Sequence, residues 1–171
     1  AVLAFAAAPV FAQQSANPAV TSPDSPKERN APAPADHPNT VDQLFIRQAA
    51  IGGMAEVELG RLAGSRAQSD SVKRFAKQMV DDHSKANDRL ARLARDNQAL
   101  LPKSADRDPE MKATRERLEK LRGAQFDAAY MAAQVGDHQK TAHLLEHVIG
   151  SGQDAAVKAY AVETLPVVMR H

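Results

Sequence analysis

Residues 72–97, VKRFAKQMVDDHSKANDRLARLARDN, are the stretch that decides the fold class. Apolar side chains recur in it every three or four positions, which is the spacing of residues along one face of an α-helix. Counted from His83, the positions that share its helix face hold Val72, Ala76, Met79, Val80, Ala86, Asn87, Leu90 and Ala94. The stretch therefore predicts a long amphipathic helix that carries a histidine in its apolar face.

The same periodicity extends in both directions and predicts an all-α protein. Helices are expected at about 40–67, 70–97, 109–123, 124–149 and 155–171. The 109–123 helix is short and lies in the one long connection, whereas the other connections are tight turns. Four long helices with a single crossover are typical of a four-helix bundle. The chain also has no Trp and few aromatic residues, which is unlike a sheet protein.

The first 40 residues differ in composition from the rest of the chain. Residues 1–12, AVLAFAAAPVFA, are too short to span a bilayer and resemble the end of a secretory signal peptide. Residues 13–40 are rich in proline and have almost no large apolar side chains, so we expect a disordered linker before a bundle at 41–171. No later segment predicts a transmembrane span. We therefore expect a periplasmic or secreted protein, with association to the outer membrane as a further possibility.

Each long helix carries an ionisable side chain on its apolar face. These are Glu56, His83, His138 and His171, from the first helix to the last. At a rise of about 1.5 Å per residue, the four positions lie at similar heights near the middle of the bundle. A buried carboxylate is costly unless it is paired, protonated or bound to a cation, and imidazoles with a carboxylate suit Zn, Fe, Mn or Cu. The four residues are therefore candidate metal ligands.

A second interpretation of this cluster needs no metal. In it, the ring nitrogens of His83 and His138 are satisfied by neighbouring polar groups: Glu56, Asn87, Tyr160, Thr141 or a buried water. Such a hydrogen-bonded layer would fix the register of the helices. In either case Asp82 and Asp137, each one residue before a histidine, are candidate partners that orient the imidazole rings.

Four strings in the chain resemble the motifs of a known family. They are GGMAEVELGRLA (52–63), VKRFAKQMVDDHSKAN (72–87), FDAAYMAAQVGDHQKT (126–141) and YAVETLPVVMRH (160–171). Over residues 41–171 the chain resembles a bacterial family of predicted exported or outer-membrane proteins, domain-of-unknown-function family four-one-four-two. The resemblance implies a ferritin-like four-helix bundle with no established activity.

The positions that match the family motifs are largely the inward-facing groups: Glu56, Asp82, His83, Asp137, His138, Leu165, Pro166 and His171. The last helix of the family continues beyond the position of His171, so we expect this chain to be clipped there as well as at its N-terminus. The Glu-x-x-His motif of ferritin-like di-iron oxidases is absent, because Val80 and Val135 stand three residues before the two histidines. Di-iron chemistry would therefore rest on analogy of fold alone.

The charge balance and the candidate residues restrict the function. A formal net charge of +1 gives no basic surface for nucleic acid. No nucleophile is paired with a base, so no catalytic residue is assigned and an enzyme is not favoured. The leading hypothesis is an exported bundle with a binding, envelope or stress-related role, whose buried Glu/His cluster could bind a transition metal. The alternatives are a metal-dependent oxidoreductase and a purely structural or partner-binding bundle, with envelope association and homo-oligomers left open.

Overall fold

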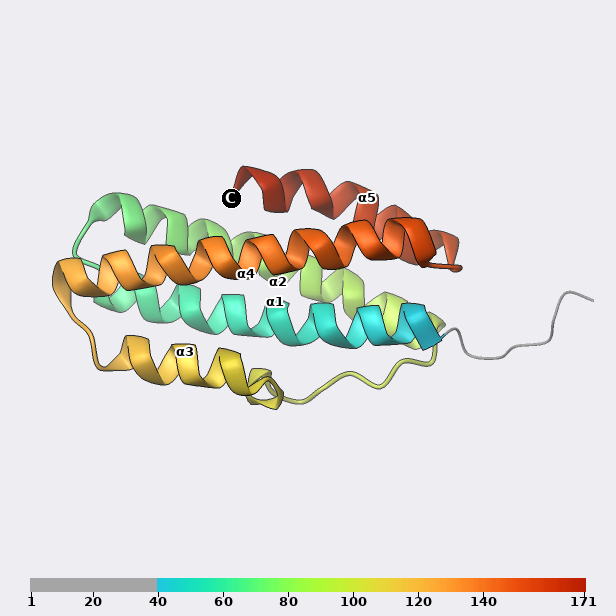
Figure 1. Ribbon diagram of the computed structural model, residues 1–171, viewed down its shortest axis with the longest axis horizontal. Helices are drawn as coiled ribbons and strands as arrows, with labels where there is room; N and C mark the ends of the chain where they lie inside the picture. Colours follow the sequence, from blue (N-terminus) through green and yellow to red (C-terminus); the bar gives the residue numbers. More distant parts are fainter. Residues whose placement is uncertain (1–39) are drawn as a thin grey trace, which may run out of the picture. The chain divides into compact units, whose positions relative to one another are not determined.

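The computed structural model describes residues 40–171, and in this range the chain is entirely helical (Figure 1). Its elements are α1 (Thr40–Arg66), α2 (Asp70–Asp96), the 3-10 turn η1 (Ala105–Arg107), α3 (Pro109–Glu119), α4 (Gly123–Ser151) and α5 (Ala155–Arg170). The predicted all-α bundle is confirmed, including the short helix α3 in the connection between α2 and α4. The predicted signal remnant, residues 1–12, and nearly all of the predicted linker lie outside the described residues.

The long helices lie alongside one another as two hairpins. α1 packs most extensively against α2, and α4 packs against α5. Contacts between α1 and α4 join the hairpins, whereas α5 touches α2 only lightly. The short helix α3 lies along the side of α1 (Figure 1). This antiparallel arrangement with one long crossover is the topology of a ferritin-like bundle, and it surrounds one interior with side chains from α1, α2, α4 and α5.

Capping residues explain where three of the helices begin. Ser69, Asp108 and Asp154 each accept a hydrogen bond from a backbone N–H in the first turn of α2, α3 and α5. Such bonds satisfy donors that a helix leaves without an internal partner. The predicted starts of these helices are therefore confirmed. α4 begins differently, at Gly123, whose φ of +60° is a left-handed conformation that glycine adopts without steric cost.

The buried apolar side chains form two clusters along the bundle. One cluster includes Phe45, Ile46, Leu90, Leu93, Leu145, Val148 and Tyr160. The other includes Leu59, Ala63, Val72, Ala76, Leu118, Phe126 and Tyr130. Along α1, α2 and α4, the residues between the clusters include Glu56, His83, Gln134 and His138. The polar groups therefore form a layer between two apolar halves of the core.

A buried carboxylate fixes the start of α5 against the start of α1. Asp42 is fully buried in the first turn of α1. Its Oδ2 accepts hydrogen bonds from the backbone N–H of Gln153 at 3.1 Å and of Asp154 at 2.6 Å. These bonds set the position of α5 along the bundle, and hence the height at which His171 follows its last turn. Sequence reasoning does not predict this contact.

Candidate metal centre

Three histidines from three helices converge in the polar layer. His83 lies in α2, His138 lies in α4, and His171 follows the last turn of α5. The ring centroid of His138 is 5.3 Å from that of His171 and 5.7 Å from that of His83. The centroids of His83 and His171 are 5.8 Å apart, and one nitrogen of each ring lies within 4.8 Å of the other two. The structure thus brings together three of the four predicted metal ligands.

His138 is oriented by a carbonyl one turn earlier on its own helix. Its Nδ1 lies 2.9 Å from the backbone oxygen of Gln134. Because a carbonyl oxygen can only accept, Nδ1 carries the proton and donates it. In the neutral ring, Nε2 then presents a lone pair. The side chain is only 11% exposed, and this burial lowers the pKa of His138, which favours the neutral ring.

His171 is oriented by a carboxylate from another helix. Its Nε2 lies 3.1 Å from Oδ2 of Asp82 in α2, and the carboxylate oxygen accepts this hydrogen bond. Nδ1 is then the nitrogen with the lone pair, and it lies 3.2 Å from Nε2 of His138. The side chain of His171 is 2% exposed. When both rings are neutral, two lone pairs face each other and neither nitrogen can donate to the other.

His83 supplies a third nitrogen, and this one has no partner. Its Nε2 is buried and makes no hydrogen bond within the described residues. Burial, with the neighbouring rings of His138 and His171 adding to it, lowers the pKa of His83 to about 3. The ring is therefore neutral at ordinary pH, and a neutral imidazole is a suitable metal ligand. None of the protein side chains expected as partners in a metal-free layer makes a hydrogen bond to this atom.

Glu56 lies beside Nδ1 of His138, away from the converging nitrogens. Its Oε1 is 3.8 Å from that Nδ1, and its Oε2 accepts a hydrogen bond from Nε2 of Gln134 at 2.7 Å. Burial raises the pKa of Glu56 to about 7, against the effect of the Gln134 hydrogen bond and with a further contribution from the charge of Asp137. Glu56 is thus a neighbour of His138, and its role as a direct ligand stays a prediction.

Gln134 is the residue of the site that sequence reasoning did not single out. It is 2% exposed. Its side chain holds Glu56 and its backbone oxygen holds His138, while its own Oε1 has no partner among the described residues. Gln134 precedes His138 by four residues and so shares its helix face. That spacing is the signal that could have marked it.

The two aspartates that precede histidines differ in their contacts. Asp82 does contact an imidazole, but the ring belongs to His171 and not to the adjacent His83. Asp137 makes no hydrogen bond to a ring; its Oδ1 lies 3.8 Å from Nζ of Lys140 and its Oδ2 is buried without a partner. Successive residues of a helix point about 100° apart, so an aspartate does not face the histidine that follows it. The orienting partner comes instead from one turn earlier on the same helix, as Gln134 does for His138, or from another helix, as Asp82 does for His171.

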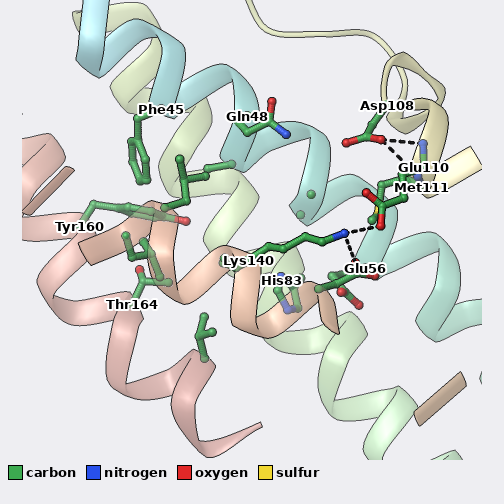
Figure 2. Close-up of a pocket in the computed structure, with 18 residues that line it drawn as sticks. Phe45, Gln48, Glu56, His83, Asp108, Glu110, Met111, Lys140, Tyr160 and Thr164 are labelled. Atoms are coloured by element: carbon green, nitrogen blue, oxygen red, sulfur yellow. Dashed lines mark hydrogen bonds and ion pairs between the residues drawn. The ribbon is translucent and has the colours of Figure 1, made fainter. Parts of the chain in front are cut away.

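Two pockets lead to the histidines from different sides. A pocket of about 280 Å³ is lined by residues of every long helix and α3, including Glu56 and His83 (Figure 2). A second pocket, of about 480 Å³, is lined by His138 and His171 among others. The centre can therefore be approached without disrupting the apolar clusters.

Comparison with known proteins places the chain in a family. The family described as Domain of unknown function (DUF4142) matches residues 27–171. The chain belongs to this family. No curated protein matches the DUF4142 chain in sequence. The resemblance inferred from the four sequence motifs is therefore confirmed, and it brings no assigned activity with it.

A crystal structure shows a similar fold. The DUF4142 chain resembles a presumed secreted DUF305 protein from Streptomyces coelicolor with a TM-score of 0.64 and 18% sequence identity, over 76% of this chain and 86% of that chain. At this identity the similarity concerns the fold alone. Within residues 40–171, no helix is both long enough and apolar enough to cross a membrane.

Proposed function

We propose that this DUF4142 protein is an exported metal-binding bundle that holds one divalent transition-metal ion between His83, His138 and His171. The hydrogen-bond pattern carries the proposal. One nitrogen of His138 and one of His171 donates to an oxygen, which leaves the other nitrogen of each ring turned toward the centre. Outer partners of this kind fix the orientation of metal-binding histidines. His83 adds a buried nitrogen with no other partner among the described residues.

The spacing of the rings suits a tetrahedral ion. Two nitrogens bound at about 2.0–2.1 Å to one tetrahedral Zn²⁺ lie about 3.3 Å apart, with their ring centroids about 5 Å apart. The 3.2 Å between Nε2 of His138 and Nδ1 of His171, and the 5.3 Å between their centroids, agree with this geometry. The ring of His83 lies slightly further away, at 5.7 and 5.8 Å. A small inward movement of this ring would complete a three-histidine site.

A metal-free polar layer accounts less well for the same contacts. Without an ion, the 3.2 Å contact between His138 and His171 requires an extra proton on one of the rings. Burial lowers the pKa of His138 and so opposes an extra proton on that ring. A metal-free layer also gives Nε2 of His83 no protein partner among the described residues, so this nitrogen would need a buried water. A bound cation removes both difficulties.

Three imidazoles favour Zn²⁺ or Cu²⁺ among the metals that the sequence suggests. Imidazole nitrogen suits both ions, whereas Mn²⁺ prefers carboxylate and water ligands. Cu²⁺ lies above Zn²⁺ in the general order of affinities, so the supply of metal in the compartment decides between them. Burial raises the pKa of Glu56 to about 7, and a cation nearby would favour its ionised form, which would place negative charge beside the Nδ1 of His138 without occupying a ligand position.

Ferritin-like oxidase chemistry is not favoured, because the carboxylates that would bridge two iron ions are missing. Position 135, three residues before His138, is a valine that is 57% exposed, and position 80 is Val80. The nearby carboxylates of Glu56 and Asp82 are engaged with Gln134 and His171. The centre therefore supports binding or buffering of an ion better than redox turnover.

Export is part of the proposal on two grounds. Residues 1–12 resemble the end of a secretory signal, and the fold resembles that of a DUF305 protein presumed to be secreted. An ion-binding role in the cell envelope or outside the cell fits both. Fractionation of cells that express the full-length gene tests this location, and recovery of the protein in the cytoplasm alone would contradict it.

Elemental analysis and calorimetric titration test the metal centre. Tag-free protein is treated with a chelator, dialysed, and titrated with Zn²⁺ and Cu²⁺. We expect one ion per chain, and its loss in His83→Ala and His138→Ala variants whose circular dichroism shows a folded bundle. His147→Ala is the matched control, because it removes an exposed imidazole from α4. Unaltered binding in both core variants contradicts the proposal.

A further inference from the structure

We propose that the 280 Å³ pocket is the route by which a divalent cation reaches the three histidines, with the ammonium of Lys140 as a displaceable plug near its entrance. The inference rests on the proposed function, because it assumes an ion between His83, His138 and His171. It adds the path of entry and a residue that controls the rate. Four features of the pocket support it: its carboxylates, Lys140, the small residues along α1, and His83 among the residues that line it.

Carboxylates line the pocket from its surface end to its interior. The exposed fraction of the side chain falls from 65% at Glu110 to 12% at Asp137 and 6% at Glu56. The negative charges of Asp108 and Glu110 both act on Asp137, and that of Asp137 acts on Glu56. A cation moving inward therefore meets negative charge at each step.

The ammonium of Lys140 already lies on this path. Its Nζ forms an ion pair with Glu110 and lies 3.8 Å from Oδ1 of Asp137. In Figure 2 its side chain reaches to Glu110 at one end of the pocket, whereas Phe45 and Tyr160 line the other end. The Lys140 side chain is 55% exposed, and exposed ion pairs contribute little stability. It can therefore swing into solvent and leave two carboxylates to an incoming metal ion.

Part of the pocket wall along α1 is made of small residues. Ala49, Gly52 and Gly53 line it. A Cβ atom on Gly52 would meet no atom within 4 Å, so the space beside it is open. His83 lines the same pocket, and its Nε2 is the buried nitrogen without a partner among the described residues. The pocket thus connects the surface carboxylates to the ring of His83, one of the three rings assigned to the ion.

The rate of Co²⁺ binding tests this route. Metal-free full-length protein is mixed with excess Co²⁺, whose visible absorption changes on tetrahedral coordination, and the association rate constant is measured at low salt. One carboxylate about 8 Å away in water raises the local concentration of a divalent ion about fivefold, and added salt reduces the effect. We therefore expect Glu110→Lys, which changes the charge by two units, to slow association about 25-fold, and Lys140→Met, which changes it by one unit, to accelerate association about fivefold.

Two matched variants separate this route from general electrostatics. Glu163→Lys reverses a carboxylate of similar exposure, 61%, that does not line the pocket. Glu146→Lys reverses one that lines the second pocket. We expect both to bind Co²⁺ at the wild-type rate. Slowing by Glu146→Lys but not by Glu110→Lys would move the entrance to the second pocket, and equal slowing by all three reversals would leave no specific route; either result overturns the proposal.

A steric variant gives an independent test. Gly52→Leu places a side chain in the open space of the pocket, so it should slow association at every salt concentration and leave the equilibrium affinity unchanged. An unaltered rate in this folded variant overturns the route. If the wild type binds no Co²⁺ at equilibrium, the metal centre itself is refuted. If it binds one equivalent at rates that none of the pocket variants changes, only the route is refuted.

Discussion

Replacing Glu56 by glutamine should make the stability of the metal-free protein sensitive to acid. The reason is that burial shifts the pKa values of two groups, Glu56 and His83, in opposite directions. Burial raises the pKa of Glu56 from 4.5 to about 7. Burial and the two neighbouring rings lower the pKa of His83 from 6.5 to about 3. In the wild type, each group offsets the effect of the other on the free energy of unfolding.

The signs follow from proton linkage. The contribution of a neutral His83 is complete above about pH 6.5 and is lost as the pH falls toward about 3, because the unfolded chain binds a proton that the fold excludes. The contribution of a protonated Glu56 is complete below about pH 4.5 and is lost as the pH rises toward about 7. From about pH 7 to about pH 5, His83 removes about 2 kcal/mol and Glu56 adds about 2 kcal/mol. The lowered pKa of His138 adds to the loss of stability in acid, whereas burial raises the pKa of Asp137, which opposes that loss.

Urea unfolding of chelator-treated protein, followed by circular dichroism across this pH range, measures the effect. The Glu56→Gln variant should lose about 2 kcal/mol more than the wild type between about pH 7 and about pH 5. Glu58→Gln is the control on the same helix, because it removes a carboxylate that is 40% exposed and paired with Arg115. Comparison with this variant separates the effect of the buried carboxylate from the general effect of removing a carboxylate from α1. If the free energy of unfolding changes with pH equally in Glu56→Gln and the wild type, the proposed compensation between Glu56 and His83 is refuted.

Zn²⁺ at about a hundred times its dissociation constant should raise the free energy of unfolding by about 2.7 kcal/mol; a melting temperature that neither Zn²⁺ nor a chelator changes would contradict the metal centre. Asp82→Asn should weaken Zn²⁺ binding about 10- to 100-fold in calorimetric titration, because His171 loses the carboxylate that fixes its orientation; wild-type affinity would show that this hydrogen bond is dispensable. Asp42→Ala should destabilise the bundle by about 2–4 kcal/mol in denaturant unfolding, because the backbone N–H groups of Gln153 and Asp154 lose their acceptor; a loss below about 1 kcal/mol would mean that water replaces the carboxylate.

The positions of the histidines could be predicted because helical periodicity is a local property of the sequence. The apolar spacing around His83 and around His138 shows which side of each helix is buried, and counting residues from the turns gives their approximate heights. These two quantities suffice to place side chains from different helices in one layer. The structure brings the rings of His83, His138 and His171 together there.

The partners of these groups could not be predicted in the same way, because they depend on how one helix is rotated against another. Asp82 is a predicted partner of an imidazole ring, but which ring it contacts depends on where α5 lies against α2, and in the structure that ring is His171. In the sequence Gln134 is one polar residue among many, and only the tertiary structure shows that its side chain donates a hydrogen bond to Glu56. Asp42 looks like a first-turn acid, and only the tertiary structure shows that it holds the turn before α5. The sequence pattern does not predict which side chains of different helices contact one another.

The light packing of α5 against α2 has a consequence for how an ion would leave. Helical segments with few tertiary contacts open at a much lower free energy than the whole domain. Opening of the α5 segment next to His171 would break the hydrogen bond of His171 to Asp82 while the hairpin of α1 and α2 stays folded. Release of the ion is then a local event in one helical segment. Amide hydrogen exchange in that segment should be fast in the metal-free protein and slow once the ion joins the three helices. The exchange rate of this one segment would therefore report whether the site holds an ion.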